Sequence, residues 1–199
     1  MSDNIPKLVA LFEHLPGIGP RQARRFVYAL LDMDADVARE LADGILQLRA
    51  EVSRCTECFR AFSGTGTVCS VCNIRGNSPT LLVVERDVDL ENLDKLAVYD
   101  GLTFILGGTV SSLETDMRFV RLRELFDKVK RSPQITELII ATSATNEGDT
   151  TAAYITKIME EFLKAGRLTI TRLGRGLSTG TQLEFSDRAT LEQAIKNRR

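Results

Sequence analysis

Apolar residues in the first quarter of the chain recur every three or four positions, which is the spacing of one face of an α-helix. Three stripes are present, made of Leu8, Leu11, Phe12 and Leu15, then of Phe26, Val27, Leu30 and Leu31, and then of Val37, Leu41, Ile45, Leu48 and Val52. Residues 16–20 separate the first two stripes, and Pro20 suits the first turn of a helix because its missing N–H is not needed there. Residues 1–54 are therefore expected to be helical.

From residue 79 the pattern changes to short continuous apolar runs that alternate with helical stripes. Buried strands are predicted for residues 80–84, 102–106 and 138–142, and a fourth strand is predicted for residues 168–171. A helical stripe lies between the second and third runs and comprises Phe119, Leu122, Leu125, Phe126 and Val129; a further helix is expected over residues 152–163. Strands alternating with helices are typical of a largely parallel α/β sheet.

All four cysteines lie between these two regions, as two C-x-x-C pairs. Cys55 and Cys58 form the first pair, and Cys69 and Cys72 form the second after ten intervening residues. A tight turn brings each pair of thiolates onto one ion, and two pairs complete a tetrahedral set of four sulfurs. Such a closed set has no open position for water or substrate, so we expect residues 55–78 to hold one structural Zn²⁺. Two disulfides are the alternative.

The remaining composition bears on the cellular location and on the partners. The first residues carry charges and lack the continuous apolar core of a signal peptide, and no apolar run approaches the ~20 residues needed to cross a bilayer. A cytoplasmic location without a membrane partner is therefore expected, and thiols kept reduced there favour zinc over disulfides. The formal net charge is −1, so any contact with DNA must depend on a few placed cations.

The turn between the first two helices carries a candidate binding site. Gly17 and Gly19 allow the backbone to turn tightly and to approach a phosphate closely, and the N–H groups at the start of the next helix are free to bind an anion. Arg21, Arg24 and Arg25 follow directly. This frame resembles the helix-hairpin-helix motif, which implies contact with the DNA backbone without sequence preference. A corner between packed helices in a protein-interaction module is the alternative.

Acidic residues follow two of the predicted strands, where open α/β sheets place their sites. Glu85 follows the first strand, and Glu147 and Asp149 follow the third. This arrangement resembles the Toprim domain, which holds Mg²⁺ with a glutamate after its first strand and an Asp-x-Asp after a later one. The Asp-x-Asp position is occupied here by the neutral Ser143 and Thr145, so we predict a Toprim-like fold without a catalytic centre. Helix capping, partner contact and metal binding remain open for the three carboxylates.

The order of these parts is similar to that of the RecR family of bacterial recombination mediators. The predicted α+β architecture has four modules: a helix-hairpin-helix region at 1–54, a four-cysteine zinc module at 55–78, a Toprim-like domain at 79–172 and a C-terminal segment at 173–199. The resemblance implies that the protein is not an enzyme and that it binds DNA as a dimer or a ring-like tetramer. It also implies a nucleoid-associated location and joint action with RecO or RecF to load RecA at gaps.

The same resemblance implies that Glu85, Glu147 and Asp149 lie on a surface that binds a partner protein. The alternative function is that of a Mg²⁺-dependent nuclease or strand-joining enzyme of the Toprim type. The neutral residues at the Asp-x-Asp position argue against this alternative.

Overall fold

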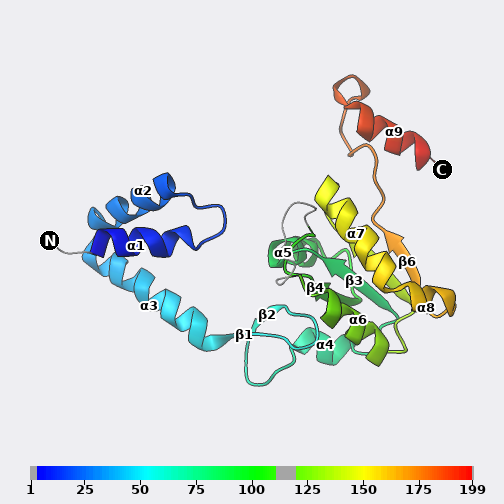
Figure 1. Ribbon diagram of the computed structural model, residues 1–199, viewed down its shortest axis with the longest axis horizontal. Helices are drawn as coiled ribbons and strands as arrows, with labels where there is room; N and C mark the ends of the chain where they lie inside the picture. Colours follow the sequence, from blue (N-terminus) through cyan, green and yellow to red (C-terminus); the bar gives the residue numbers. More distant parts are fainter. Residues whose placement is uncertain (1–3, 111–119, 199) are drawn as a thin grey trace. The chain divides into compact units, whose positions relative to one another are not determined.

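The computed structural model describes residues 4–110 and 120–198 of the chain. It divides into two compact units, Met1–Val52 and Ser53–Arg199. Figure 1 shows an all-helical first unit and a second unit built on a sheet. Phe119, which belongs to one of the predicted helical stripes, lies outside the described residues.

The described residues of the first unit form three helices, namely α1 (Asn4–Glu13), α2 (Pro20–Leu31) and α3 (Ala35–Glu51). The helices α1 and α2 pack around Val9, Ala23 and Val27. The prediction that Leu31 faces this small core is wrong, because 64% of Leu31 is exposed. It is the last residue of α2, and this end of the helix is exposed.

The third helix is present as predicted, but it has no buried residue. Its predicted apolar stripe is exposed among the described residues, at Val37, Leu41, Ile45 and Leu48. The helix begins after Asp34, whose side chain accepts a hydrogen bond from the N–H of Asp36 at 2.9 Å. The local sequence therefore explains where α3 begins. No described residue of its unit buries the apolar face of this helix.

The second unit is built on a four-stranded parallel sheet with the order β4-β3-β5-β6. The strands are β3 (Thr80–Val84), β4 (Leu102–Ile105), β5 (Glu137–Ala141) and β6 (Thr169–Arg172). Helices cover both faces of a sheet of this kind, so its strands are continuous apolar runs rather than alternating ones. The prediction of four parallel strands is confirmed.

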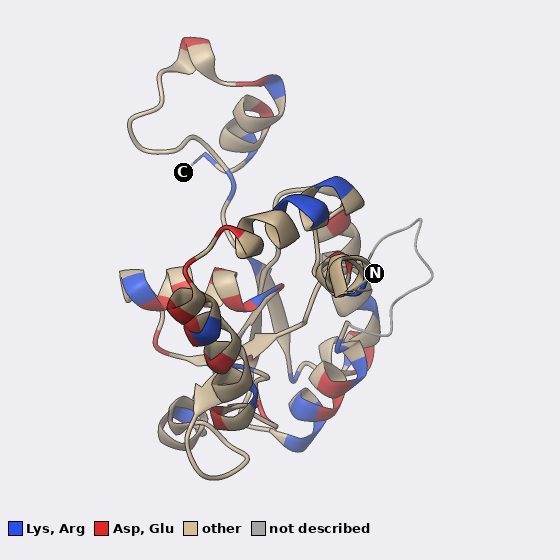
Figure 2. Ribbon diagram, turned by 90° about the vertical axis from the view of Figure 1, so that its left-hand side faces the viewer, with Lys and Arg blue, Asp and Glu red and all other residues tan. Residues whose placement is uncertain are grey.

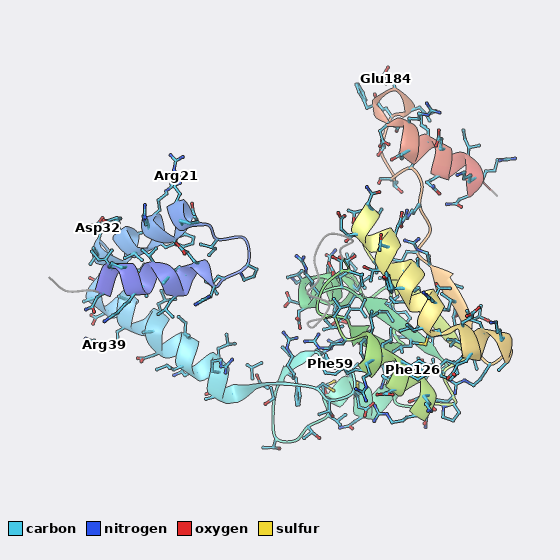
Figure 3. All side chains as sticks on the ribbon, in the orientation of Figure 1. Arg21, Asp32, Arg39, Phe59, Phe126 and Glu184 are labelled. Carbon is cyan, nitrogen blue, oxygen red and sulfur yellow. The ribbon has the colours of Figure 1, made fainter. Side chains whose placement is uncertain are left out.

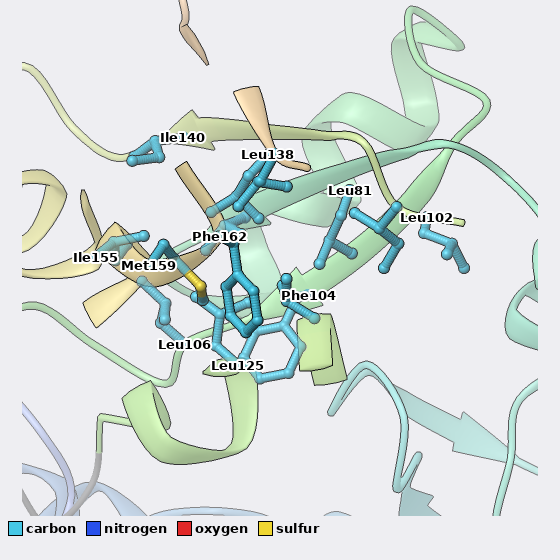
Figure 4. Packing of buried hydrophobic residues seen from close by; sticks show 14 of the residues in the cluster. Leu81, Leu102, Phe104, Leu106, Leu125, Leu138, Ile140, Ile155, Met159 and Phe162 are labelled. Atoms are coloured by element: carbon cyan, nitrogen blue, oxygen red, sulfur yellow. The ribbon is translucent and has the colours of Figure 1, made fainter. Parts of the chain in front are cut away.

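Helices cover both faces of this sheet. They are α5 (Asp87–Leu96), α6 (Leu122–Arg131), α7 (Asn146–Ile158) and α8 (Glu160–Lys164). On one face, Phe104 packs with Leu125 of α6, Phe162 of α8 and Met159, which lies between α7 and α8 (Figure 4). On the other face, Leu90 of α5 packs against Leu82, Val84 and Ile105.

The helix α7 begins six residues earlier than residues 152–163 predict. Thr145 is its N-cap, and the Thr145 hydroxyl accepts a hydrogen bond from the N–H of Gly148 at 3.1 Å. The capping hydroxyl satisfies one of the free donors of the first turn, which extends the helix beyond its apolar stripe.

Five further described elements belong to the cysteine module and to the C-terminal tail. The cysteine module contains a small sheet of β1 (Val52–Arg54) and β2 (Ala61–Ser63) and the short helix α4 (Ser70–Arg75). The C-terminal tail contains the 3₁₀ turn η2 (Leu183–Phe185) and the helix α9 (Arg188–Lys196). None of the described helices combines the length and apolar character needed to cross a bilayer.

Candidate metal centre and nucleic-acid interface

The four cysteine sulfurs form one buried cluster, in which all ligand atoms lie within 4.8 Å of one another. The Sγ atoms of Cys55 and Cys72 are 3.9 Å apart, and those of Cys58 and Cys69 are 3.7 Å apart. A disulfide requires about 2.05 Å. Tetrahedral zinc with bonds of about 2.3 Å separates its sulfurs by about 3.8 Å. The arrangement fits one Zn²⁺ and is not that of two disulfides.

Local backbone geometry presents these sulfurs. The first C-x-x-C turn is closed by two hydrogen bonds of 2.9 Å, from the N–H of Phe59 to the carbonyl of Cys55 and from the N–H of Cys55 to the carbonyl of Arg60. The N–H of Cys69 donates to the Sγ of Cys55 at 3.3 Å. A hydrogen bond with Cys72 lowers the pKa of Cys58 to about 5. Four neighbouring thiolates repel one another, so full deprotonation requires a cation between them.

The cysteine module is joined directly to the edge of the large sheet. The carbonyl of Cys58 accepts a hydrogen bond from the N–H of Ile105 in β4 at 2.9 Å. The carbonyl of Ile105 accepts one from the Arg121 guanidinium at 3.1 Å, and that guanidinium also lies over the ring of Phe59. The Phe59 ring in turn packs edge-on against Phe104, with 5.3 Å between ring centroids. The module therefore covers the outer edge of β4.

A buried ion pair adds to this junction. Lys128 of α6 is only 4% exposed, and its Nζ lies 2.7 Å from Oε2 of Glu57, between the first two cysteines. The hydrogen bond from Lys128 holds the pKa of Glu57 below its usual value. Removing one partner would leave a buried charge without compensation. The module and the sheet therefore depend on each other for stability.

The hairpin turn in the first unit leaves its backbone accessible. Gly17 has φ of +80°, which favours glycine, whereas Gly19 has an extended φ of −85° and is the N-cap of α2. A Cβ added at Gly19 would have no neighbour within 4 Å. Neither the backbone conformation nor packing against the described residues therefore requires glycine at this position. Its absent side chain leaves open the surface beside the first N–H groups of α2, those of Arg21 and Gln22.

Three arginines border this open surface. Arg21, Arg24 and Arg25 are all exposed, and none takes part in an ion pair between described residues. Figure 3 shows Arg21 projecting away from the body of the hairpin. Cations and free N–H groups are thus combined at one helix N-terminus, which is an arrangement suited to phosphate.

The acidic residues lie at the carboxyl end of the sheet, but they do not converge. Glu85 is 6% exposed, and its carboxylate accepts hydrogen bonds from the N–H and the hydroxyl of Ser143, at 2.7 and 2.9 Å. Asp149 binds the guanidinium groups of Arg172, at 2.6 Å, and of Arg175. Glu147 is exposed in the first turn of α7. Among the described residues, only the cysteines form a group of three or more potential metal ligands.

The chain was compared with known families and proteins. The family model "RecR, helix-hairpin-helix" matches residues 5–49, "Toprim domain" matches 79–174, and "RecR, C-terminal" matches 176–199. "Recombination protein RecR" of Prochlorococcus marinus strain MIT 9215 is 33% identical over 98% of this chain and 94% of its own length. The proteins of the same name from Herpetosiphon aurantiacus and Chlorobium phaeobacteroides are each 34% identical, over 98% and 99% of this chain and 93% and 97% of their own lengths.

The chain belongs to the RecR family. The predicted order of modules is therefore confirmed: N-terminal helices, a four-cysteine cluster that fits zinc, a Toprim domain and a short C-terminal segment. Within this RecR chain, Ser143 stands directly beside Glu85.

Two features of the RecR site were not predicted. One is the hydrogen bond that Ser143 donates to Glu85, and the other is the ion pairing of Asp149 with Arg172 and Arg175. Arg172 is the last residue of β6 and Arg175 follows the strand, whereas Glu85 follows β3 and Asp149 follows β5. The carboxyl ends of parallel strands lie at one edge of a sheet. The predicted strands therefore indicated that these side chains would lie close together.

There is no room for a side chain at residue 148, which explains why a glycine lies between the two acidic residues of α7. A Cβ on Gly148 would lie 2.0 Å from the carbonyl oxygen of Ser143. We expect Gly148→Ala to lower the free energy of unfolding by about 1–3 kcal/mol, because the loop that holds Glu85 must shift. Gly174→Ala is the control in the same unit, since a Cβ there has no neighbour within 4 Å. Denaturant unfolding checks both variants, and equal stability would contradict the steric argument.

The two arginines that bind Asp149 change the pH range over which its carboxylate is protonated. Hydrogen bonds from Arg175 and then Arg172 lower the pKa of Asp149 from 3.8 to about 2. A lowered pKa means that the interaction is present above pH 4 and is lost as the pH falls through 2. Carboxyl NMR titration should therefore give a midpoint well below 3.8, which Arg175→Ala raises. Arg188→Ala, which removes an ion pair with Glu192, should leave this midpoint unchanged.

Proposed function

We propose that this chain is a non-enzymatic DNA-binding mediator of recombinational repair. The observation that carries the proposal is the hairpin. No contact among the described residues requires glycine at position 19, and Gly19 lies beside the free first-turn N–H groups of α2 and three arginines without described ion pairs. Main-chain donors and arginines of this kind bind phosphates and carry no base information. Binding to DNA without sequence preference follows.

The family supports the cellular role. The relatives are recombination proteins, and the similarity covers nearly the whole chain. We infer that this protein acts in the cytoplasm, at the nucleoid, with RecO or RecF to load RecA at gaps. Of the three carboxylates at the sheet edge, Glu85 is buried and bonded to Ser143, and Asp149 is exposed but bound to two arginines, whereas Glu147 is exposed without a described ion pair. A basic group of the partner protein would therefore meet Glu147 first.

The metal in this account is one structural Zn²⁺ held by Cys55, Cys58, Cys69 and Cys72. The sulfur spacing supports zinc, and the four ligands leave no position for a reacting water. When bound, the ion supplies folding energy rather than chemistry. The chain itself supplies the turns, the N–H···S hydrogen bond and the buried setting of the sulfurs.

The geometry of the sheet edge opposes the alternative of a Mg²⁺-dependent nuclease. Such a site needs several carboxylate oxygens directed at one hard cation. Here the carboxylate of Glu85 is engaged by Ser143, and that of Asp149 is engaged by two arginines. Incubation of labelled DNA with the protein and Mg²⁺ or Mn²⁺ should give no cleavage. Cleavage that disappears in Glu85→Ala would establish the enzymatic alternative.

Self-association completes the proposal, because one hairpin binds weakly and several linked hairpins gain avidity. The helix α3 offers a surface for it. Its residues Ala38, Leu41, Ile45 and Leu48, followed by Val52, have the 3-4-3-4 spacing of a coiled-coil seam. An isolated helix of 17 residues that buries nothing is marginal in water, so we propose that a second copy of this chain covers the seam.

Binding to single-stranded DNA across a salt series tests the proposed function. Phosphate contacts release counterions, so the affinity should fall steeply and linearly on a plot of log K against log salt. Oligonucleotides of different sequence should give the same line. A protein that fails to bind DNA at low salt would contradict the proposal.

A further inference from the structure

The exposed face of α2 carries an aromatic ring beside its arginines. Tyr28 is 55% exposed, and it lies seven residues after Arg21, four after Arg24 and three after Arg25. Residues at these spacings share one face of an α-helix. The helix has no acidic residue, and its arginines are coloured blue in Figure 2. One face of α2 therefore presents three cations and one ring to the solvent.

No packing among the described residues requires a tyrosine at this position. Tyr28 is not part of the cluster of Val9, Ala23 and Val27 that joins α1 to α2, and it forms no described aromatic pair. An aromatic side chain on a helix also loses rotamer freedom, which alanine does not. Local folding therefore does not account for Tyr28.

A groove lies beside this ring, between α1 and α2. Its volume is about 320 Å³, which is within the range of small-molecule sites. The helix α1 supplies an apolar wall that includes Ile5 and Val9, and α2 supplies Tyr28 and Arg24. The one carboxylate of the lining belongs to Glu13, so the lining has no net charge. An uncharged, planar group suits this groove better than a phosphate does.

We propose that Tyr28 stacks on a nucleobase of a single DNA strand whose phosphates are bound at the start of α2. The arginines and the free N–H groups hold the backbone of the strand, and the neighbouring groove takes the base. At about 1.5 Å per residue, Tyr28 lies about 10 Å along the helix axis from Arg21, which a few nucleotides of one strand span. Stacking tolerates any sequence, because every base has a π-face.

This inference rests on the proposed function and adds a preference for single strands to it. Phosphates are available on single strands and on duplexes, so the arginines alone would bind both. In a duplex each base is stacked between its neighbours, and a side chain reaches its face only after the base has been extruded. Tyr28 therefore gains a contact only from unpaired bases, such as those that a gap in a duplex presents.

Two strands of equal charge test the contact in the full-length, zinc-loaded protein. One is an oligonucleotide of thymidines, and the other has the same number of phosphates but consists of abasic residues. We expect Tyr28→Ala to lower the affinity for the thymidine strand by about fivefold or more, since this is the usual loss for one stacked base. The variant should bind the abasic strand, and duplex DNA, as the unsubstituted protein does.

Tyr28→Phe and Leu11→Ala are the matched controls. Tyr28→Phe keeps the π-face, so it should keep the affinity for the thymidine strand. Leu11 is 62% exposed on α1 and does not line the groove, so Leu11→Ala removes an exposed apolar side chain of the same unit without removing the ring. Neither control should change the affinity for either strand by more than about twofold.

The salt dependence distinguishes the ring from the arginines. Stacking releases no counterions, so Tyr28→Ala should lower the affinity for the thymidine strand equally at every salt concentration. The slope of log K against log salt should stay that of the unsubstituted protein. A reduced slope would assign the effect of Tyr28 to phosphate contacts and would overturn the stacking.

Tyrosine fluorescence reports on the ring directly. The chain has three tyrosines and no tryptophan, so its tyrosine emission can be followed without interference. A base stacked on Tyr28 should quench part of this emission when the thymidine strand is added, and the abasic strand should not. Tyr28→Phe should lose the quenching while it keeps the affinity.

The outcomes separate this inference from the proposed function. A loss of affinity confined to the strand with bases supports stacking on Tyr28. An equal loss on both strands, or no loss on either, overturns the stacking and leaves the proposed phosphate contacts of α2 standing. Equal losses together with weaker self-association would show that a second copy of the chain covers the ring, which also overturns it. A protein that binds neither strand at low salt overturns the proposed function and this inference together.

Discussion

Cys55→Ser is expected to yield a zinc-poor protein whose second unit unfolds at a much lower temperature. Structural zinc sites in small modules contribute apparent free energies of about 10–16 kcal/mol at neutral pH, and a serine hydroxyl is a poor substitute for a thiolate. Even a loss of about 3 kcal/mol lowers the midpoint by roughly 10 °C in a unit of this size. Zinc content and thermal unfolding measured on the same sample check the prediction.

The damage should extend beyond the cysteine module, because Cys58 covers the outer edge of β4 through its carbonyl. A disordered module would expose that edge, so low solubility is expected as well. Thr56→Ala is the control: it removes a 3.2 Å hydrogen bond to the carbonyl of Thr67 and keeps all four thiols. Its cost should be near 1 kcal/mol. A metal-free Cys55→Ser protein with an unchanged midpoint would show that zinc is dispensable.

Arg21→Ala combined with Arg24→Ala is expected to weaken DNA binding and to flatten its salt dependence. Each phosphate contact on single-stranded DNA contributes about 0.7 to the slope of log K against log salt, so two lost contacts reduce it by about 1.4. The affinity at low salt should fall most, since screening already weakens the contacts at high salt. Fluorescence anisotropy with a labelled oligonucleotide over several salt concentrations measures both quantities.

The matched control for this pair is Arg39→Ala. Arg39 lies in the same unit, but its guanidinium is 3.0 Å from the carboxylate of Asp36 in α3. Its removal changes the net charge without touching the hairpin, so the slope should remain that of the unsubstituted protein. A double variant with an unchanged slope, or an equal effect of Arg39→Ala, would place the DNA contacts elsewhere.

The sequence was sufficient for the elements whose signals are local. Continuous apolar runs marked β3, β4 and β5 because these strands lie between layers of helices, whereas β6 was marked by the alternating Leu168 and Ile170. The two C-x-x-C pairs marked the cysteine cluster because their spacing alone brings four sulfurs together. Gly17 marked a real turn, since its φ of +80° favours glycine.

Features that depend on distant residues were not predictable in the same way. The hydrogen bond from Ser143 to Glu85 forms only because β3 and β5 are neighbours in the sheet. The outer edge of β4 is covered only because the N–H of Ile105 reaches the carbonyl of Cys58. The helix α3 shows a further limit. Its periodicity correctly predicted a helix, but an apolar stripe does not say whether the surface that covers it belongs to the same chain.

The central claim is that main-chain N–H groups at the start of α2 bind DNA phosphates. Amide NMR spectra recorded while a short single-stranded oligonucleotide is added at low salt test it most directly. The account predicts shifts concentrated at Gly17, Gly19, Arg21 and Gln22, which salt reverses. Unmoved signals at these positions, with shifts elsewhere in the chain, would contradict it.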